Sequence, residues 1–193
     1  DEVNAIYIAT PPDSHEVYAL AAIRAGKPVY VEKPMALHAA SAQVMLEAAQ
    51  KEDVKLCVAH YRPQQPYFKK IKELLDQKAI GDVLWADLRF LQPHKKEMMG
   101  NDGNFWRVDP SISGGGIFHD LAPHQLDLML YFFGAPLEAI GLSFNHGNHY
   151  KADDVVSGSA LLPNNILFRG LWHFNAPEKE KEDVCEIWGT RGK

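Results

Sequence analysis

Residues 29–34 read Val29-Tyr30-Val31-Glu32-Lys33-Pro34, an apolar run that ends abruptly in an acid, a base and a proline. A short apolar run of this kind is typical of a strand buried in a parallel sheet. Similar runs lie at 3–10 and 55–59, and helical patterns that begin near Ser14 and Ser41 separate the three runs. This alternation predicts a doubly wound α/β fold, in which right-handed crossovers make all three strands parallel.

The end of this strand is a candidate functional position. In an open α/β sheet, ligands collect at the carboxyl ends of the strands, where Lys33 would stand. A tight bend is needed to aim Lys33 from the strand end into a cleft. The Lys33–Pro34 bond is the plausible place for a cis peptide in such a bend, so we expect it to be cis.

A second stretch points to chemistry. Residues 114–129 run from three glycines into a helical pattern that carries Asp120, Pro123 and His124, and Gly134 is suited to end it. We expect Asp120 at the N-cap or in the first turn, with Pro123 also in the first turn. Asp120 and His124 then share one helix face, so the carboxylate can orient the imidazole and stabilise its charged form. The glycines would let backbone approach a bound group closely. The alternative is a capped core helix with an incidental histidine.

The remaining chain predicts a second kind of architecture. A helix from Pro66 to about Lys78 precedes a strand at 83–91, a long loop at 93–113 and, after the central helix, strands at 137–146, 153–162, 165–174 and 183–189. These elements predict an α+β domain with an open, largely antiparallel sheet that helices cover on one face. The other face needs a partner, and large apolar residues of the strands are candidates for that interface: Phe144, Leu171, Trp172 and Phe174.

Composition narrows the class of protein. The chain has 193 residues, 23% charged and 46% hydrophobic, which is ordinary for a soluble globular protein. Its net charge of −5 and the lack of a basic stripe argue against nucleic acid as a partner. No apolar run approaches membrane-spanning length, and no signal peptide opens the chain. Two isolated cysteines, Cys57 and Cys185, fit a reducing compartment, so we expect a cytoplasmic protein.

Five motifs occur in order along the chain: Ala9-Thr10-Pro11-Pro12-Asp13-Ser14-His15, Glu32-Lys33-Pro34, Tyr61-Arg62-Pro63, Trp106-Arg107 and the glycine-rich stretch that leads to Asp120 and His124. This ordered set resembles the Gfo/Idh/MocA oxidoreductases over essentially the whole chain. The resemblance implies hydride transfer between NAD or NADP and a sugar, a polyol or a derivative. It also implies a cis Lys33–Pro34 peptide.

The resemblance also assigns residues. It places Lys33, Asp120 and His124 in the catalytic neighbourhood, with His124 as base and Lys33 polarising the substrate oxygen. It implies a set of residues that contact the cofactor: Thr10, Pro11, Pro12, His15, Glu32, Lys33, His60, Arg62, Trp106 and Arg107. His60 departs from the asparagine that the family more often shows. Trp106 could also wall a sugar ring. No metal site is expected.

The family pattern predicts more chain than is present. The Gly-x-Gly-x-x-Gly fingerprint of dinucleotide-binding proteins is absent, as is the acid that would follow it and hold the ribose. We therefore expect an interior fragment. Residues 1–62 would be the C-terminal part of a dinucleotide-binding domain, and residues 63–193 a substrate-binding domain that forms a homo-oligomer through its sheet. Neither the choice between NAD and NADP nor the substrate can be inferred from the sequence.

Three alternatives remain at this point. His119 and Asp120, with His124 and Asp127, could ligate a metal in a phosphohydrolase, although that fold is helical and this chain is rich in strands. A branch of the same family uses tightly held NAD to cleave glycosides by oxidation and elimination. A non-catalytic unit for substrate binding and assembly is the third alternative.

Overall fold

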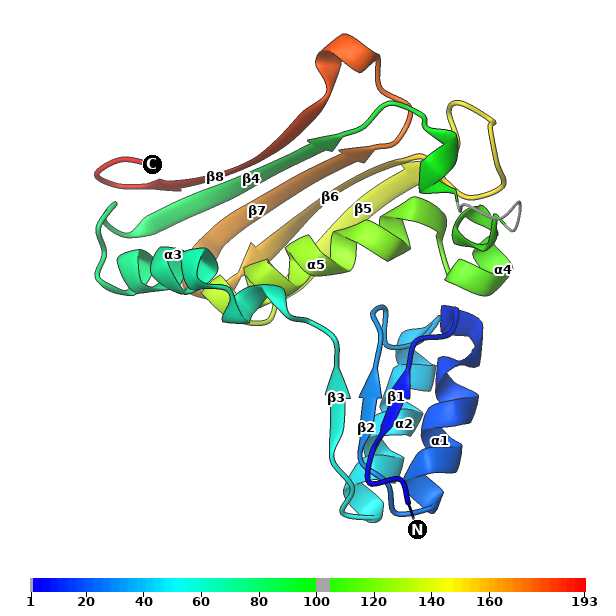
Figure 1. Ribbon diagram of the computed structural model, residues 1–193. Coiled ribbons are helices and arrows are strands. Elements are labelled where there is room, and N and C mark those ends of the chain that lie inside the picture. Colours follow the sequence, from blue (N-terminus) through cyan, green and yellow to red (C-terminus); the bar gives the residue numbers. More distant parts are fainter. Residues whose placement is uncertain (1, 100–104) are drawn as a thin grey trace. The chain divides into compact units, whose positions relative to one another are not determined.

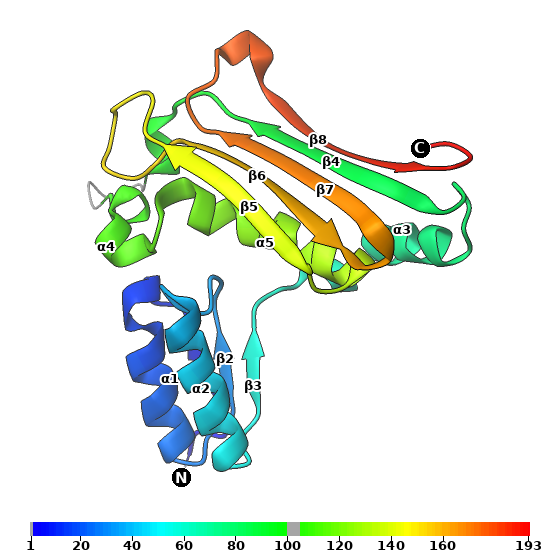
Figure 2. The same ribbon diagram turned by 180° about the vertical axis from the view of Figure 1, so that it is seen from behind.

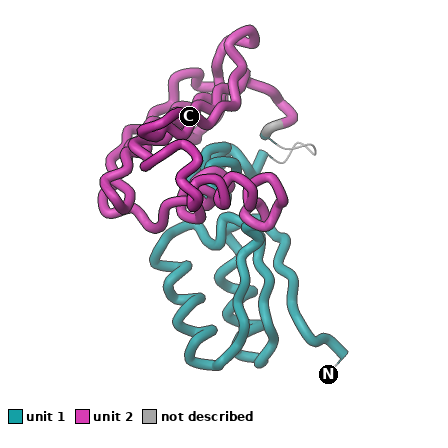
Figure 3. Tube along the Cα trace, turned by 90° about the vertical axis from the view of Figure 1, so that its left-hand side faces the viewer, with its two compact units in different colours: residues 1–60, 99–123 teal, residues 61–98, 124–193 magenta. Residues whose placement is uncertain are grey.

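The computed structural model describes residues 2–99 and 105–193. Figure 1 shows the chain coloured from its N-terminus to its C-terminus. The chain forms two compact units (Figure 3), one of residues Asp1–His60 and Met99–Pro123, the other of residues Tyr61–Met98 and His124–Lys193. Part of the loop expected at 93–113, residues 100–104, lies outside the described residues.

Unit 1 contains the predicted parallel sheet. Its strands are β1 (Ile6–Ile8), β2 (Val29–Val31) and β3 (Leu56–Val58), in the order β1-β2-β3, and both pairs are parallel. The helices α1 (His15–Arg24) and α2 (Ala39–Lys51) lie on the same face of this sheet (Figures 1 and 2). Two right-handed crossovers that advance in one direction across a sheet place both helices on one face.

The core of unit 1 lies between that face and the helices. Small residues of α1 let it approach the sheet closely, and branched residues fill the strands. The buried residues are Ile8, Ala19, Ala22, Ile23, Val29, Val31, Met45 and Ala49. The helix α1 follows Ser14 as predicted, whereas α2 begins at Ala39 instead of Ser41, because the extended backbone of His38 already provides the N-cap.

The central helix α5 (Gly116–Phe133) begins earlier than the sequence predicts. It follows the short helix α4 (Pro110–Ser113), which ends at the left-handed Gly114. The Ser113 hydroxyl accepts a hydrogen bond from the Gly116 N–H at 2.9 Å, which satisfies one of the N–H groups that have no partner within the helix. The prediction that Asp120 and Pro123 occupy the first turn is therefore wrong. Pro123 lies inside α5, where it lacks only the one N–H that would bond four residues back.

Unit 2 is built on the predicted open sheet. Its order is β5-β6-β7-β4-β8, where β4 pairs with β7 in parallel and the other pairs are antiparallel. The strands are β4 (Val83–Leu91), β5 (Glu138–Phe144), β6 (Val155–Leu162), β7 (Ile166–His173) and β8 (Glu182–Gly189). The helix α3 (Pro66–Asp76) and the later turns of α5 lie along one face of this sheet (Figures 1 and 2), and the Phe68 and Phe132 rings meet at 6.5 Å.

Short single-turn helices complete the connections. They are η1 (Pro12–Ser14), η2 (Arg62–Gln64), η3 (Lys96–Met98), η4 (Trp106–Val108), η5 (Pro163–Asn165) and η6 (Glu178–Glu180). Pro163-Asn164-Asn165 turns the chain between β6 and β7, with both asparagines at positive φ. In the described part of the chain, no helix combines the length and the apolar character needed to cross a membrane.

The prediction of the open face of the unit 2 sheet is half right: Phe144 and Leu171 lie on that face, whereas Trp172 and Phe174 do not. Side chains alternate along a strand, so Leu171 and Trp172 point to opposite faces. Trp172 is 2% exposed and Phe174 is fully buried, so these two residues lie on the covered side, and their assignment to an interface is wrong. The large apolar residues that stand exposed on β5 are Ile140 (78%), Leu142 (75%) and Phe144.

Candidate active site

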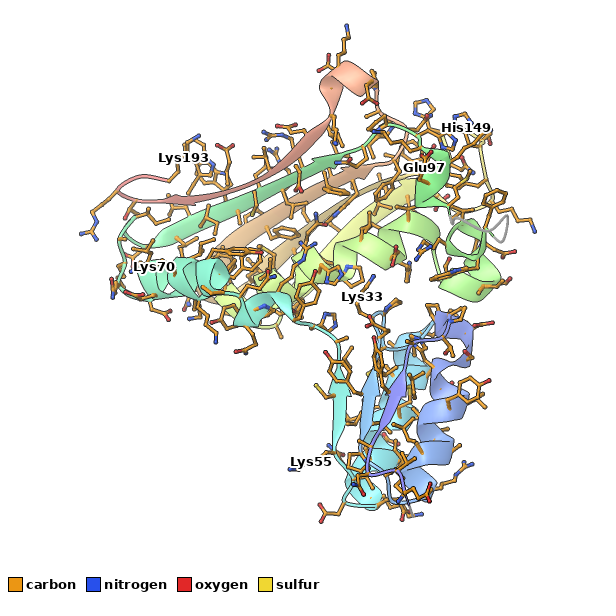
Figure 4. All side chains as sticks on the ribbon, in the orientation of Figure 1. Lys33, Lys55, Lys70, Glu97, His149 and Lys193 are labelled. Carbon is orange, nitrogen blue, oxygen red and sulfur yellow. The ribbon has the colours of Figure 1, made fainter. Side chains whose placement is uncertain are left out.

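Lys33 follows β2 directly and lies at the end of that strand, where Figure 4 labels it. Its side chain is 13% exposed. The ammonium Nζ donates to the Asp120 carboxylate Oδ1 and to the Asp120 backbone oxygen, both at 2.6 Å. The peptide bond between Lys33 and Pro34 is cis, as predicted. A largely buried cation is thus fixed at the carboxyl end of the sheet.

Asp120 lies between two cations. Its second carboxylate oxygen, Oδ2, is 3.4 Å from the Arg107 Nε, and the Arg107 guanidinium lies over the Trp106 ring at 4.6 Å from its centroid. Within unit 1, the hydrogen-bond partner of the carboxylate is Lys33, and the pairing of Asp120 with His124 stays a prediction. The Asp120 carboxylate therefore holds Lys33 and, more loosely, Arg107.

His124 belongs to unit 2, one turn beyond Asp120 in the same helix. It is 8% exposed, and the Tyr61 ring meets it edge-on at 5.4 Å. The neighbouring Gln125 accepts a hydrogen bond from the Trp172 indole at 2.7 Å in a buried setting, which ties this turn of α5 to β7. The sequence analysis gave Tyr61 no role of its own, although it stands in the motif next to Arg62 and Pro63.

The glycines before α5 make room for a side chain. A Cβ at Gly115 would lie 1.9 Å from the Nδ1 of His119, so only glycine lets that ring pack here without displacement. Desolvation in this position lowers the pKa of His119, which favours the neutral imidazole. The glycine-rich stretch thus seats His119 beside Asp120.

The other predicted cofactor residues of unit 1 lie at the strand ends. Thr10 and Pro11 follow β1, and the Ser14 hydroxyl donates to the Thr10 hydroxyl at 2.8 Å. Glu32 accepts a hydrogen bond from the Tyr7 hydroxyl at 2.5 Å, and this bond raises the pKa of Tyr7. Pro12 is buried as the first residue of η1, and His60 follows β3. Arg62, at the start of η2, belongs to unit 2.

His15 occupies a different environment from its neighbours. It is fully buried, and its two ring nitrogens lie 2.8 Å from the Thr10 carbonyl oxygen and 3.0 Å from the Pro34 carbonyl oxygen. Backbone groups therefore account for both polar atoms of the ring. A direct cofactor contact by His15 stays a prediction.

The strand ends fit one part of a dinucleotide. Parallel strands bring Thr10, Glu32 and Lys33 to the same edge of the sheet, and this set offers hydroxyl, carboxylate and ammonium groups that suit a ribose and a carboxamide. A pyrophosphate needs close backbone approach at a glycine-rich helix start, whereas the turn before α1 contains Pro11 and Pro12. The residues of this chain fit the nicotinamide–ribose portion.

A metal centre gains no support from the geometry. Among the residues that the structure describes, no group of three or more His, Cys, Asp or Glu side chains is arranged to hold a metal ion. His119 and Asp120 are adjacent on a helix, so they diverge by about 100°.

Comparisons with known proteins cover nearly the whole chain. Residues 1–60 match the family described as "Oxidoreductase family, NAD-binding Rossmann fold", and residues 68–193 match "GFO/IDH/MocA C-terminal domain". The chain is 47% identical over 192 residues to Oxidoreductase P35 of Formosa agariphila, covering 100% of this chain and 59% of that protein. It is 28% identical to the 1,5-anhydro-D-fructose reductase of Ensifer adhaerens, covering 99% of this chain and 56% of that protein.

The fold agrees with these matches. The structure of a levoglucosan dehydrogenase in complex with NADH and levoglucosan superimposes with a TM-score of 0.85 at 25% identity, covering 98% of this chain and 52% of that chain. The chain therefore spans about half the length of the relatives it matches. Both domain matches, the order of the motifs and the fold agree, and the chain belongs to the Gfo/Idh/MocA family of oxidoreductases.

Proposed function

We propose that the protein containing this chain is an NAD(P)-dependent oxidoreductase that transfers a hydride between a nicotinamide and a sugar, a polyol or a related derivative. The observation that carries the proposal is the pair formed by Lys33 and Asp120, in which a carboxylate fixes an ammonium at the end of a parallel strand. Such a preorganised cation stabilises the oxygen that gains negative charge when a carbinol is oxidised.

The chain's own residues divide the remaining work. The bound nicotinamide supplies the hydride acceptor or donor. Lys33 polarises the substrate oxygen, and Asp120 holds Lys33 in place. His124 takes up the hydroxyl proton at a ring nitrogen, since an imidazole titrates near neutrality, and returns the proton in the reverse direction. The cofactor residues proposed for this chain are Thr10, Pro11, Pro12, His15, Glu32, Lys33, His60, Arg62, Trp106 and Arg107.

The substrate class rests on the relatives. One relative is named a 1,5-anhydro-D-fructose reductase, and a structural relative is a levoglucosan dehydrogenase bound to NADH and levoglucosan. Both names describe sugar derivatives. A polar hydroxyl-rich ligand is also compatible with the charged trio of Lys33, Arg107 and Asp120, because each group can bond a hydroxyl. We infer a sugar or polyol substrate, with NAD or NADP as the cofactor.

We also infer that the open face of the unit 2 sheet contacts a second copy of the protein. Its β5 strand exposes Ile140, Leu142 and Phe144, an apolar edge that water solvates poorly. Residues 1–62 would serve the cofactor, and residues 63–193 the substrate and assembly. A cytoplasmic location is consistent with the free thiols of Cys57 and Cys185.

The test is an activity screen on the full-length protein. Purified protein is incubated with NAD or NADP and a panel of aldoses, polyols and anhydro-sugars that includes levoglucosan, and reduced nicotinamide is followed by absorbance. The reverse assay uses reduced cofactor and 1,5-anhydro-D-fructose. We expect turnover with at least one sugar or polyol, and a His124→Asn variant that loses roughly 10²–10⁴-fold in rate. No turnover across the panel with either cofactor would contradict the proposal.

A further inference from the structure

His15 is a fully buried polar side chain whose position the proposed chemistry does not yet explain. It begins α1, yet its ring turns inward and reaches two backbone segments that are far apart in sequence. The Nε2 atom lies 2.8 Å from the Thr10 carbonyl oxygen, just after β1. The Nδ1 atom lies 3.0 Å from the Pro34 carbonyl oxygen, just after β2.

Both contacts have the geometry of hydrogen bonds, and in both the partner can only accept. An imidazole ring uses both nitrogens as donors in its doubly protonated form, and it uses one of them in either neutral tautomer. Thr10 and Pro34 lie just beyond β1 and β2, and each bond that the ring donates satisfies the carbonyl oxygen that accepts it. The ring therefore acts as a brace between the two strand ends.

The brace lies next to the proposed reacting group. Pro34 is bonded directly to Lys33, and the Lys33 ammonium reaches the Asp120 oxygens at 2.6 Å. The two anchors act on opposite ends of the same residue, since Asp120 holds the side chain of Lys33 and His15 holds the backbone beside it. Loss of the His15 anchor frees the backbone without touching the ammonium.

We propose that His15 is a positioning residue, which ties the Thr10 and Pro34 carbonyl groups together and so fixes the turn from which Lys33 projects. This role rests on the proposed function only in that Lys33 is taken to carry chemistry. The brace itself is independent of the substrate and of the cofactor. It can therefore be tested without an assay.

The first test is hydrogen–deuterium exchange of the full-length protein, read by mass spectrometry. His15→Phe keeps a ring but removes both donors, whereas His15→Gln keeps one donor group. Ile23→Ala is the matched control, because Ile23 is fully buried in the same helix and its side chain has no hydrogen-bonding group. We expect exchange in residues 32–37 to rise about tenfold in His15→Phe, less in His15→Gln, and not selectively in Ile23→Ala.

The proposal would be overturned if exchange in the His15 variants rose as much in α1 and α2 as in residues 32–37. Unchanged exchange in residues 32–37 would overturn it as well. If His15→Phe fails to fold, the His15→Gln variant gives the same comparison with a smaller rise.

The second test couples the brace to turnover. His15→Gln is measured alone and together with Lys33→Ala, with the substrate that the activity screen identifies. We expect His15→Gln alone to lower kcat about tenfold or more, and to change it less than about twofold once Lys33 is replaced, because coupled residues are not additive. If His15→Gln lowered kcat by the same factor with Lys33 present and with Lys33 replaced by alanine, His15 would not act through Lys33, and the proposal would be overturned. Wild-type turnover in Lys33→Ala alone would instead contradict the proposed function and leave the exchange result to decide the brace.

Discussion

At the scale of single residues, the pairing of Asp120 shows what local spacing can and cannot predict. The four-residue interval to His124 is visible in the sequence, and it suggested that the carboxylate orients the imidazole. That pairing stays a prediction, and within unit 1 the carboxylate also bonds Lys33, which is 87 residues away. A contact of this range has no signature in local periodicity. The order of the motifs brought Lys33 and Asp120 into one neighbourhood, but it did not predict which atoms meet.

Asp120→Asn tests the role of that carboxylate. The amide has nearly the same shape but no charge, so Lys33 loses its ionic partner and its fixed position. We expect kcat of the full-length enzyme to fall by roughly 10²–10³-fold, with little change in the dissociation constant of the cofactor. Asp153→Asn is the control, because the Asp153 carboxylate accepts a hydrogen bond from the exposed Ser143 hydroxyl in unit 2 and has no role in the proposed chemistry. Turnover at the wild-type level in Asp120→Asn would remove Asp120 from the catalytic group.

Asp87 is a buried acid that the sequence analysis did not single out. Its carboxylate lies 2.6 Å from both the Arg169 Nε and an Arg89 nitrogen. The hydrogen bond from Arg169 is the largest cause that holds the pKa of Asp87 below its ordinary value. The folded state therefore binds fewer protons at this site than the unfolded state does.

The sign of the pH dependence follows from that difference. A carboxyl with a lowered folded pKa contributes stability that is present above its unfolded pKa of about 3.9 and is lost as pH falls through the folded value. We expect Asp87→Asn to lower the unfolding free energy by about 1–3 kcal/mol at neutral pH and to reduce the loss of stability below pH ~4. Urea denaturation across pH measures both effects, with the exposed Glu47→Gln as control. Equal acid sensitivity in Asp87→Asn and wild type would refute this account.

At the scale of elements, periodicity predicts where helices and strands lie better than where they begin. The sequence placed the start of α5 near Asp120, because acids are common in first turns and Pro123 is tolerated there. In the structure the helix begins at Gly116, because the hydroxyl of the buried Ser113 accepts a hydrogen bond from the Gly116 N–H. Ser113 is a polar residue that precedes the glycines, so hydrophobic periodicity alone did not point to it.

Ser113→Ala measures how much this hydroxyl stabilises the start of α5. Removing it leaves the Gly116 N–H without its acceptor, so we expect a loss of about 1 kcal/mol in unfolding free energy. Ser111→Ala is the matched control in the same short helix, where the exposed hydroxyl bonds only the nearby Asp109 side chain and a smaller loss is expected. Thermal unfolding of both variants measures the two losses of unfolding free energy, and we compare them. A larger loss in Ser111→Ala would show that the hydroxyl of Ser113 does not start the helix.

At the scale of the whole molecule, the sequence predicted both sheets but not how the chain is divided. The alternation of strands and helices in residues 1–60 and the run of strands after residue 137 identified the two architectures. The compact units, however, assign Met99–Pro123 to the first unit, far along the chain from β3. Sequence patterns indicate local structure only, so they could not predict that Met99–Pro123 packs with the first unit.

Helices lie along only one face of the unit 2 sheet, and the open face leads to a prediction about assembly. Trp172 of β7 is buried, and the most exposed apolar residues of β5 are Ile140 and Leu142. If that face contacts a second copy, replacing both with aspartate places charges in the interface and should convert the oligomer to a monomer. Light scattering at micromolar concentration measures the mass. A matched double replacement of exposed lysines on α3, Lys69 and Lys70, should leave it unchanged. A wild-type protein that is monomeric at that concentration would contradict the assembly proposal.

The measurement that tests the central claim most directly is the single-turnover rate of hydride transfer in the full-length enzyme with Lys33→Ala. The claim is that the ammonium held by Asp120 stabilises the substrate oxygen during the reaction. We predict a rate roughly 10²–10⁴-fold below wild type, with the cofactor still bound at close to the wild-type dissociation constant. A rate within a few-fold of wild type, with the cofactor and substrate bound normally, would contradict the account.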